Sequence, residues 1–577
     1  MSLHRIERRI PVADASFPDS LHPLLRHVYA ARQIKSGVEL NNTLATLHDF
    51  HGFSNMDSAV TLLADFVQQQ RRILIVGDFD ADGATSSALG VRALRRLGAQ
   101  QVDYLVPNRF EYGYGLTPEI VTLAKQRKPE LIITVDNGIS SLAGVAAARA
   151  ADIRVLVTDH HLPGTGLPIA DAILNPNLPG DGFPSKALAG VGVMFYLLLA
   201  LRAHLRASGW FESQAIPEPN LAEFLDIVAL GTVADLVPLD HNNRVLVAQG
   251  LARIRDGRGV PGIRALLETG KRNISRITAA DLGFAVGPRL NAAGRLTDMS
   301  LGIECLLTDD PVRAHELAMR LDQLNRERRD IESQMQEDAL RILAGMGGHE
   351  DDPALPFGLC LFDETWHQGV VGLVASRIKD RVHRPVVVFA RGEDGKLKGS
   401  ARSVRSVHIR DTLEAVSTRH PGLIAKFGGH AMAAGLTLEA DCFNDFAVAF
   451  DAEVRRRLPA DDLAGVLYTD GELAPEFLTL ECAELLREAG PWGQCFPEPC
   501  FDGVFYLLER HVVGSGHLKL RLAEPRTNLR LEAIAFNQAG EQLPLACKQA
   551  RIVYRPDVNE YHGERRLQLL VEHIEPV

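Results

Sequence analysis

The stretch VGDFDADGATSS (76–87) places three aspartates at alternate positions directly after an apolar run, RRILIV. A calcium-binding EF-hand loop starts in a similar way. That loop needs a glutamate at its twelfth position, where this chain has Leu89, and a helix in front, where this chain has a strand-like run. In an extended chain alternate side chains share one face, so Asp78, Asp80 and Asp82 repel one another unless cations lie between them. Taken alone, the stretch is best interpreted as a solvated acidic turn.

Two more strand-like runs end in residues of the same kind. LIITVD ends at Asp136, and RVLVTD ends at Asp159, which is followed by His160 and His161. In an open parallel sheet the carboxyl ends of the strands share one edge, where such folds bind ligands. Asp235, after the apolar run DIVALGTVAD, is a further candidate. A helix cap is the alternative for Asp159 and the histidines, but four such motifs together favour a metal site.

The types of ligand narrow the choice of metal. Carboxylates with one or two imidazoles, and no thiolates, favour Mn²⁺ or Mg²⁺ over structural zinc. Two such ions about 3.5–4 Å apart would activate water and stabilise both oxygens in a phosphoryl displacement. From the residues alone we therefore expect hydrolysis of a phosphate ester or anhydride.

The hydrophobic pattern predicts the elements that position these residues. Short β-branched runs alternate with helical stretches, which is typical of a parallel α/β sheet. After Asp310, which can cap a helix, the pattern predicts one long connector helix. The expected parts are a helical region (1–69), the α/β domain (70–270), a motif segment with the connector helix (271–350), a second, smaller α/β domain (351–458) and an OB-type β-barrel (459–577).

Composition sets broad limits on the function. The 577 residues are too many for one core, and the N-terminus has no apolar segment typical of a secretory signal. No window reaches the roughly 18 uninterrupted apolar residues that a membrane helix needs, so we expect no membrane contact. The seven cysteines form no C-x-x-C pair, so we expect reduced thiols and a cytoplasmic location. A net charge of −11 argues weakly against a nucleic-acid binder, although net charge says little about a local groove.

The order of the motifs carries a specific resemblance. DFDADG, VDNG, TDHH and TVAD, in this order, resemble the motifs of the DHH phosphoesterase superfamily. GPRLNAAGR (287–295), WHQGVVGLVASR (366–377), KGSARS (398–403) and FGGHAMAAG (427–435) resemble its companion domain, DHHA1. With YLVPNRFEYGYGL (104–116) and the β-rich tail, the pattern is similar to the 5′→3′ exonucleases of this superfamily that act on single-stranded DNA. It covers the chain from about residue 70 to the end.

The resemblance implies a set of ligands for two Mn²⁺ or Mg²⁺ ions: Asp80, Asp82, Asp136, His160 and Asp235. Asp136 is the candidate bridging ligand. The role of Asp78 stays open. Pyrophosphatase members carry a histidine where this chain has Val76, which argues against that branch.

The resemblance also implies roles around the scissile phosphate. His161 would contact the phosphate and act as a proton donor or electrostatic stabiliser, and Asp159 would orient the histidines, so that His161, Asp136 and Asp159 form the catalytic set. Arginine suits a terminal phosphate because it binds bidentately. The candidates for binding the substrate are Arg109, Arg289, Ser400, Arg402 and His430.

The implied substrate is single-stranded DNA with a 5′ phosphate end, degraded to mononucleotides in DNA repair and recombination. The barrel would hold the strand by stacking (candidates Phe505, Tyr506, Tyr554 and Tyr561) and by charge (Lys519, Arg521, Arg551, Arg555, Arg565 and Arg566), although some aromatics are equally suited to the barrel core. A monomer, with single-strand-binding protein and a RecQ-type helicase as possible partners, is expected. The alternatives are a phosphoesterase for oligoribonucleotides or nucleoside bisphosphates, and a non-catalytic DNA-binding scaffold.

Overall fold

The structure is a computed structural model of the whole chain. It describes residues 5–108, 111–112, 114–346, 355–459, 465–514, 516–538, 547–561 and 563–577. The chain divides into two compact units: residues 1–7 with 326–468, and residues 8–325 with 469–577. Each unit is described by itself.

The larger unit contains a five-stranded parallel sheet. Its order is β3 (Val102–Leu105), β2 (Ile73–Gly77), β4 (Leu131–Val135), β5 (Arg154–Thr158) and β6 (Ala172–Leu174). The chain goes from β2 to one edge, at β3, and then returns to place β4 on the other side of β2. This reversal of strand order creates a crevice beyond the carboxyl ends of β2 and β4. The predicted parallel sheet is confirmed.

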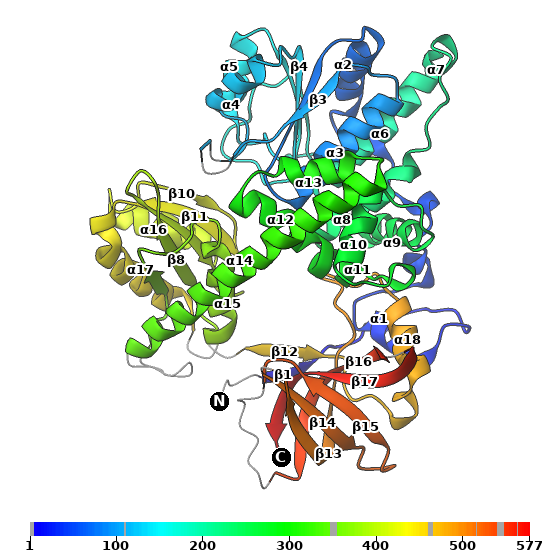
Figure 1. Cartoon of the computed structure of the whole chain (residues 1–577), viewed down its shortest axis with the longest axis vertical. Coiled ribbons are helices and arrows are strands. Elements are labelled where there is room, and N and C mark those ends of the chain that lie inside the picture. The colour runs from blue at the N-terminus through cyan, green and yellow to red at the C-terminus, as the bar shows by residue number, and fades with distance from the viewer. Residues whose placement is uncertain are drawn as a thin grey trace. The chain divides into compact units, whose positions relative to one another are not determined.

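Helices cover both faces of this sheet (Figure 1). One face packs against α2 (Met56–Gln68), α3 (Ala81–Arg96) and α6 (Gly190–Ala207), and the other against α4 (Pro118–Lys125) and α5 (Leu142–Ala150). Along β2, Ile73 and Ile75 belong to the first core, whereas Leu74 and Val76 belong to the second. Because successive side chains point to opposite faces, burial of both faces requires the continuous apolar runs that the sequence contains.

A helical layer follows the sheet in the same unit. It contains α8 (Leu225–Ala234), α9 (His241–Arg255), α10 (Pro261–Thr269), the π-helical turn η6 (Leu282–Val286), α12 (Gly287–Leu296) and α13 (Ser300–Leu307). Among the described helices, α6 alone is long and apolar enough to cross a bilayer, yet 67% of that window is buried inside the fold. A core helix meets the same test, so α6 is explained by the sheet that it covers.

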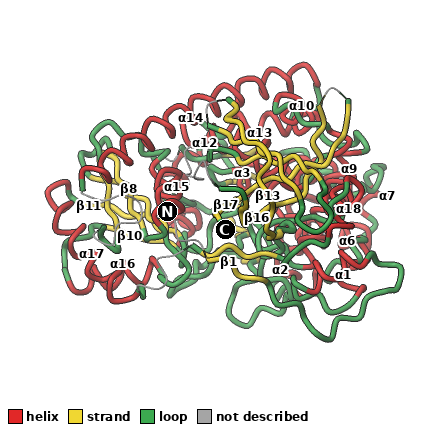
Figure 2. Tube along the Cα trace, turned by 90° about the horizontal axis from the view of Figure 1, so that it is seen from below, coloured by secondary structure: helices red, strands yellow, loops and turns green. Residues whose placement is uncertain are grey.

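The predicted long helix is α14 (Pro311–Gly345), which Figure 2 shows as one continuous helix. The Asp310 carboxylate accepts a hydrogen bond from the Val312 N–H at 2.9 Å, as expected for a cap. The boundary between the two compact units falls within α14, between Asn325 and Arg326. The helix therefore carries the chain from one unit into the other.

The smaller unit holds a second sheet, in the order β10 (Lys426–Gly429), β11 (Ala433–Leu438), β9 (Leu397–Arg402), β8 (Val386–Arg391) and β7 (Leu359–Phe362). The helices α15 (Val371–Val382), α16 (Ile409–Arg419) and α17 (Phe443–Arg457) accompany it. The apolar runs in FGLCLFD and RPVVVFARG predict the strands β7 and β8, and KLKGSARS predicts β9. No such pattern predicts the hairpin of β10 and β11, because FGGHAMAAG is rich in glycine and alanine, which are depleted in strands.

The C-terminal segment forms a closed barrel in the order β13 (Phe501–Val513), β14 (His517–Ala523), β15 (Arg530–Ala535), β17 (Glu564–Pro576) and β16 (Gln549–Tyr561). These are the five strands expected from the sequence. Between the β13–β16 barrel strands, Phe505 and Tyr554 are buried in the core with ring centroids 5.5 Å apart, so the stacking role considered for them is wrong. Tyr506 is exposed, and the side chain of Tyr561 lies outside the described residues.

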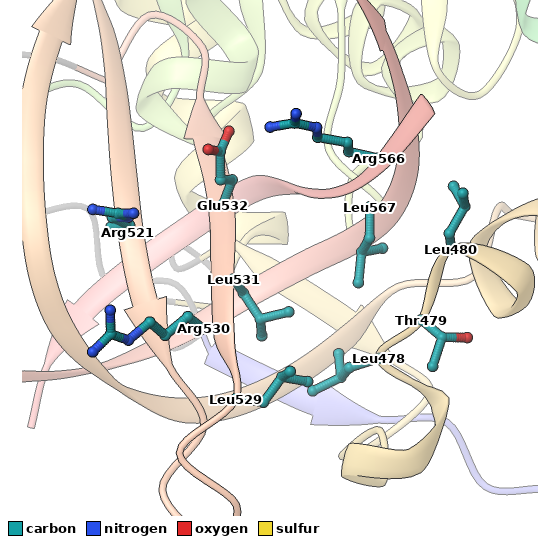
Figure 3. A pocket seen from close by; sticks show the side chains of 10 residues that line it. All are labelled: Leu478, Thr479, Leu480, Arg521, Leu529, Arg530, Leu531, Glu532, Arg566 and Leu567. Carbon is teal, nitrogen blue, oxygen red and sulfur yellow. The ribbon is translucent and has the colours of Figure 1, made fainter. Parts of the chain in front are cut away.

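The six basic residues expected to follow a DNA backbone are engaged with carboxylates. Arg521 contacts Glu509, Arg551 contacts Asp502, and the same holds for the pairs Lys519–Glu532, Arg555–Glu498, Arg565–Glu484 and Arg566–Glu564. A cavity of about 340 Å³ lies between strands β15 and β17 and the start of α18 (Leu480–Glu488). Figure 3 shows its leucine side chains together with Arg521, Arg530 and Arg566.

The N-terminal region begins with β1 (Arg5–Arg8), most of which belongs to the smaller unit, and from Arg8 on it belongs to the larger unit. It also contains α1 (Pro23–Ala30), short 3₁₀ turns and α2, so it is less helical than expected. The Arg32 guanidinium donates two hydrogen bonds to the Asp470 carboxylate, at 2.9 and 3.0 Å. Arg8 does the same to Asp502, at 3.0 and 2.9 Å.

Candidate metal centre

The first strand end is the turn from β2 into α3. Asp80 caps α3: its carboxylate accepts hydrogen bonds from the backbone N–H groups of Asp82 and Gly83, at 2.9 and 3.0 Å. Asp82 lies in the first helical turn, almost fully buried, and accepts from the N–H groups of Gly190 and Val191 at the start of α6, at 2.5 and 2.9 Å. The strand before the turn and the helix after it exclude an EF-hand.

The second strand end presents Asp136 after β4. Its backbone is left-handed, with φ of 60°, a conformation that costs a non-glycine residue about 1 kcal/mol or more. The Asp136 N–H donates to the Thr158 carbonyl at 3.1 Å. Gly190 makes the arrangement possible, because a Cβ there would lie 2.7 Å from the Asp136 Cβ and 2.9 Å from its Cα. Close packing therefore fixes the direction of this carboxylate.

The third strand end carries the two histidines after β5. The Asp159 carboxylate accepts from the N–H groups of Ile139, His160 and His161, at 2.9, 2.7 and 3.1 Å, and lies 2.8 Å from the His161 Nδ1. With its oxygens so occupied, Asp159 holds the loop and the His161 ring. These contacts support the orienting role that was predicted for it.

The three strand ends and the C-cap of α8 converge on one place. Three groups of possible ligands each have their ligand atoms within 4.8 Å of one another: Asp78, Asp80 and Asp136; Asp136, His160 and His161; and Asp82, His160 and Asp235. Asp136 belongs to two of these groups, one of them purely acidic. Asp78, whose role was open, lies in the acidic group.

Two atoms in this cluster test whether it fits a metal ion. The Asp136 Oδ1 and the His160 Nε2 are buried, have no hydrogen-bond partner among the described atoms, and lie 3.0 Å apart. A buried polar atom without a partner is costly. A bound divalent cation would satisfy both, and the carboxylate and imidazole donors match the preferences of Mn²⁺ and Mg²⁺. The residues present therefore fit such an ion.

The crowded carboxylates have strongly perturbed pKa values. Burial and the neighbouring Asp80 raise the pKa of Asp82 to about 7. Burial, followed by the charges of Asp82 and Asp80, also raises the pKa values of Asp136 and Asp235 well above the ordinary range. This is the pattern expected where several carboxylates share a site built for a cation.

The pKa values of the two histidines are shifted in opposite directions. Burial, together with the neighbouring His161, lowers the pKa of His160 to about 4, so this imidazole is neutral and can act as a ligand. Burial acts to lower the pKa of His161 as well, but the hydrogen bond and charge of Asp159 outweigh it, and the pKa of His161 is raised. The Tyr114 hydroxyl lies 3.3 Å from the His161 Nδ1 and donates to the Asp136 carbonyl at 3.2 Å.

Several residues that build this site were not singled out from the sequence. Asn175 and Asn177 donate to the carbonyls of His161 and His160, at 2.8 and 2.6 Å, and so fix the histidine loop. Asn291 accepts from the Ala81 N–H at 2.9 Å. Asn175 and Asn177 could have been found from the sequence, because both belong to LNPN, at the end of a strand-like run. Asn291 belongs to GPRLNAAGR, so this motif supports the first strand end.

The residues that were predicted to bind the DNA phosphate do not all belong to the unit that holds the carboxylate cluster. Two of them, Arg109 and Arg289, belong to the part of the chain that forms the larger unit. Arg289 is buried in an ion pair with Asp322, with Nη2 2.7 Å from its carboxylate, and donates to the Ala285 carbonyl. These contacts give Arg289 a structural role, and its contact with the substrate stays a prediction. Arg109 lies outside the described residues.

The smaller unit brings the remaining candidates onto neighbouring strands. On β9, Arg402 donates to the Ser400 hydroxyl at 3.0 Å, and Gly372 of α15 lies against both side chains. Burial lowers the pKa of Arg402 from its ordinary value. His430 is exposed in the β10–β11 turn, where its N–H donates to the Ala433 carbonyl at 2.8 Å. Ser400 and Arg402 thus form a polar pair beside the start of a helix.

Comparisons with known protein families match three separate parts of the chain. Three family models match: the DHH family, N-terminal domain, over residues 72–232; the DHHA1 domain over residues 356–456; and the RecJ OB domain over residues 469–573. The first covers the parallel sheet and its strand ends. The second and third cover the smaller sheet and the barrel.

Two similar curated proteins match over almost their whole length. The single-stranded-DNA-specific exonuclease RecJ of Dickeya dadantii is 55% identical over 571 residues, 99% of each chain. The protein of the same name from Escherichia coli is 52% identical over 574 residues, again 99% of each chain. The crystal structure of RecJ in complex with Mn²⁺ from Thermus thermophilus has a TM-score of 0.80 at 29% identity, covering 100% of this chain and 80% of that chain. The chain therefore belongs to the RecJ family.

Proposed function

We propose that this chain is a metal-dependent exonuclease that degrades single-stranded DNA from the 5′ end to mononucleotides, using two Mn²⁺ or Mg²⁺ ions. The observation that carries the proposal is the pair of orphaned ligand atoms, Asp136 Oδ1 and His160 Nε2, at the meeting point of three strand ends. Relatives named as single-stranded-DNA-specific exonucleases support the substrate, and solved relatives in complex with Mn²⁺ and Mg²⁺ support the metals.

We assign Asp80, Asp82, Asp136, His160 and Asp235 as metal ligands. Asp78 joins them, because its carboxylate lies with those of Asp80 and Asp136. Asp136 is the bridging ligand, because it is shared between an acidic and an imidazole group. Bound there, two divalent ions would polarise the scissile phosphate and lower the pKa of the attacking water.

The protein's own groups position and protonate the substrate. Asp159 holds His161 by its Nδ1, and its hydrogen bond and charge raise the pKa of His161, which favours the protonated ring. A protonated His161 supplies positive charge to the scissile phosphate and a proton to the leaving 3′ oxygen. Ser400 and Arg402 bind the DNA phosphate, with Arg109, Arg289 and His430 as further candidates.

One assay separates this function from its alternatives. The full chain is incubated with 5′-labelled single-stranded DNA, duplex DNA or a nucleoside bisphosphate, each with Mn²⁺ or EDTA. Release of mononucleotides from single strands alone, and only with metal, supports the exonuclease. Hydrolysis of the bisphosphate alone would instead identify a small-substrate phosphoesterase, and binding without hydrolysis a scaffold.

The bridging role has a direct test. Asp136→Ala should abolish hydrolysis while binding of single-stranded DNA stays measurable, because the substitution removes the shared ligand and leaves the distant contacts with DNA. Asp57→Ala, which removes an exposed carboxylate at the start of α2, is the matched control and should retain full activity. Wild-type activity in Asp136→Ala would refute the assignment.

We further propose that the chain acts as a cytoplasmic monomer in DNA repair and recombination, with single-strand-binding protein and a RecQ-type helicase as partners. The family membership supports this proposal. Sedimentation of the purified chain would test the monomer, and co-purification with each candidate partner would test the complexes.

A further inference from the structure

A second polar site lies in the larger unit, outside the carboxylate cluster. It is a cavity of about 330 Å³ formed where α3, α9 and α13 end and α10 begins. Five of its lining residues are arginines: Arg92, Arg95, Arg96, Arg253 and Arg258. Two are acidic, Glu223 and Asp309. The lining therefore has a clear excess of positive charge.

The cavity is remote from the metal ligands. Asp80 caps the start of α3, whereas Arg95 and Arg96 form its last turn. The sixteen residues of this helix span about 24 Å. A ligand in this cavity would therefore occupy a separate site and not an extension of the crevice at the strand ends.

Three of the arginines are neutralised by the protein. Arg92 contacts Asp309 at 2.5 Å, Arg96 contacts Glu223 at 3.2 Å, and Arg258 contacts Asp256 at 2.6 Å. Among the described residues, Arg95 and Arg253 form no ion pair. Arg95 donates one hydrogen bond, to the Val102 carbonyl at 3.0 Å, and the buried Nε of Arg253 has no hydrogen-bond partner. Because a guanidinium has five N–H donors, these two side chains keep most of their donors for a ligand.

Positions at helix ends explain only part of this charge. Arginines in a last helical turn interact favourably with the helix dipole, which accounts for basic residues at the ends of α3 and α9. It does not account for a buried donor without a partner, which is costly in a folded protein. The start of α10 lines the same cavity, but the protein itself serves this helix end, because the Val260 N–H donates to the buried Asp226 carboxylate at 2.6 Å. The feature left for an anion to satisfy is the Arg253 donor.

The remaining wall is apolar. Phe224, Val260, Pro261 and Leu307 line the cavity beside the arginines. A nucleotide has the matching character, because its phosphate suits bidentate arginines and its base suits an apolar surface. An extended acidic peptide fits less well, since helix ends and loops line the cavity and no strand edge is available to pair with a peptide backbone.

We propose that this arginine pocket is a second nucleotide-binding site on the catalytic domain, which holds the phosphate with Arg95 and Arg253 and the base against the apolar wall. The nucleotide comes from one of two sources, a released mononucleotide or a residue of the DNA strand outside the crevice. Both offer the same phosphate chemistry. The proposal does not depend on hydrolysis at the carboxylate cluster.

The test measures binding with the full chain in EDTA, so that no hydrolysis occurs. The probes are fluorescent dAMP and a 5′-phosphorylated thymidine oligonucleotide, followed by anisotropy. The double variant Arg95→Gln/Arg253→Gln should weaken binding by about tenfold or more, the scale of a lost charged hydrogen bond. The matched control is Arg206→Gln/Arg264→Gln, which removes the same charge from exposed arginines outside the pocket and should bind like the wild type.

Hydrogen exchange locates the ligand. Adding dAMP should protect residues 221–224 and 253–262, and with Mn²⁺ the double variant should still cleave short single strands at the wild-type rate. Weakened binding of dAMP identifies the mononucleotide as the source, and weakened binding of the oligonucleotide alone identifies the strand. If the double variant does not fold by circular dichroism, Arg258→Gln, at an exposed position, serves instead and should weaken binding by about threefold. Unchanged affinity for both probes, or protection by an acidic peptide alone, would overturn the proposal.

Discussion

At the scale of single residues, the metal centre concentrates negative charge that the protein alone does not compensate. Asp82, Asp136 and Asp235 all have raised pKa values, because burial and neighbouring carboxylates disfavour the charged form. The folded, metal-free chain therefore holds protons that the unfolded chain releases. Its stability should fall as the pH rises from the ordinary aspartate range toward about 7. Bound cations would remove this penalty.

Proton release accompanying metal binding is a direct consequence. The affinity for Mn²⁺ should rise between about pH 6 and about pH 8, because binding must displace the proton that Asp82 holds below a pKa of about 7. Calorimetry in two buffers of different ionisation enthalpy measures the number of protons released. Asp82→Asn should release fewer protons than the wild type. Equal affinity across this range, without proton release, would contradict the prediction.

The contacts of Asp159 lead to a different prediction. Asp159→Asn should lower kcat by about 10- to 100-fold, because the substitution removes the carboxylate that orients His161. The effect on KM should be smaller, because residue 159 acts on the substrate only through His161. The control is Asp171→Asn, which alters a carboxylate that accepts the Val155 N–H at the far end of β5. If Asp159→Asn raised KM and left kcat unchanged, the residue would bind substrate instead of orienting the histidine.

At the scale of elements, close packing of α3, α6 and α8 determines where the ligands lie. Gly190 at the start of α6 faces Asp136, and Gly231 of α8 faces Thr85 and Asp82. A Cβ at Gly231 would lie 2.2 Å from the Thr85 hydroxyl and 3.0 Å from the Asp82 carboxylate. These glycines let helices approach the strand ends closely enough for backbone N–H groups to bind Asp82.

Gly190→Ala tests this packing. The new methyl group would force Asp136 away, so activity should fall by about 100-fold, the scale expected for a displacement of about 1 Å at a reacting centre. The free energy of unfolding should fall by about 1–3 kcal/mol. Gly164→Ala is the matched control, since no heavy atom lies within 4 Å of its Cβ. Activity within about twofold of the wild type in Gly190→Ala would show that the site tolerates the shift.

The sequence predicts those elements that a short stretch of residues marks by itself. Continuous β-branched runs identify β2, β4 and β5, and each is followed directly by its aspartate, so three strand ends of the cluster are predictable. Asn291 and Gly190 are not, because their partners lie far away in the sequence, with 210 residues between Asn291 and Ala81 and 108 between Gly190 and Asp82, and no periodic pattern marks such contacts. Arg289 illustrates the same limit. Its motif indicates importance, but only the fold reveals its buried partner, Asp322.

At the scale of the whole molecule, two ion pairs hold the N-terminal region to the C-terminal part of the chain: the buried pair Arg32–Asp470, and the pair of the half-exposed Arg8 with the buried Asp502. Arg8 and Asp502 are 494 residues apart in sequence, and Arg32 and Asp470 are 438 apart. These pairs lie in one compact unit with the parallel sheet. Residues 8–69, in which the sequence indicates no chemistry, therefore have a structural role: they contact both the parallel-sheet domain and the C-terminal segment.

Asp502 provides the test of this connection. Burial acts to raise its pKa, but hydrogen bonds from Arg8, Thr469 and Arg551 outweigh it and lower the pKa from 3.8 to about 2. The stabilisation is therefore complete above about pH 3.8 and is lost as the pH falls toward 2. Asp502→Asn should lower the free energy of unfolding by about 1–3 kcal/mol at neutral pH, and by much less near pH 2.

The fluorescence of Trp492 reports on this part of the molecule, because the Arg32 guanidinium lies 5.1 Å from its ring centroid. Urea titrations followed at this signal should show the midpoint of Asp502→Asn shifted at neutral pH and converging with that of the wild type in acid. Asp19→Asn, which changes a fully exposed carboxylate of the same region, should leave the midpoint unchanged at both pH values. A shift of equal size in acid and at neutral pH would mean that the ionised carboxylate of Asp502 is not what joins the N-terminal region to the barrel.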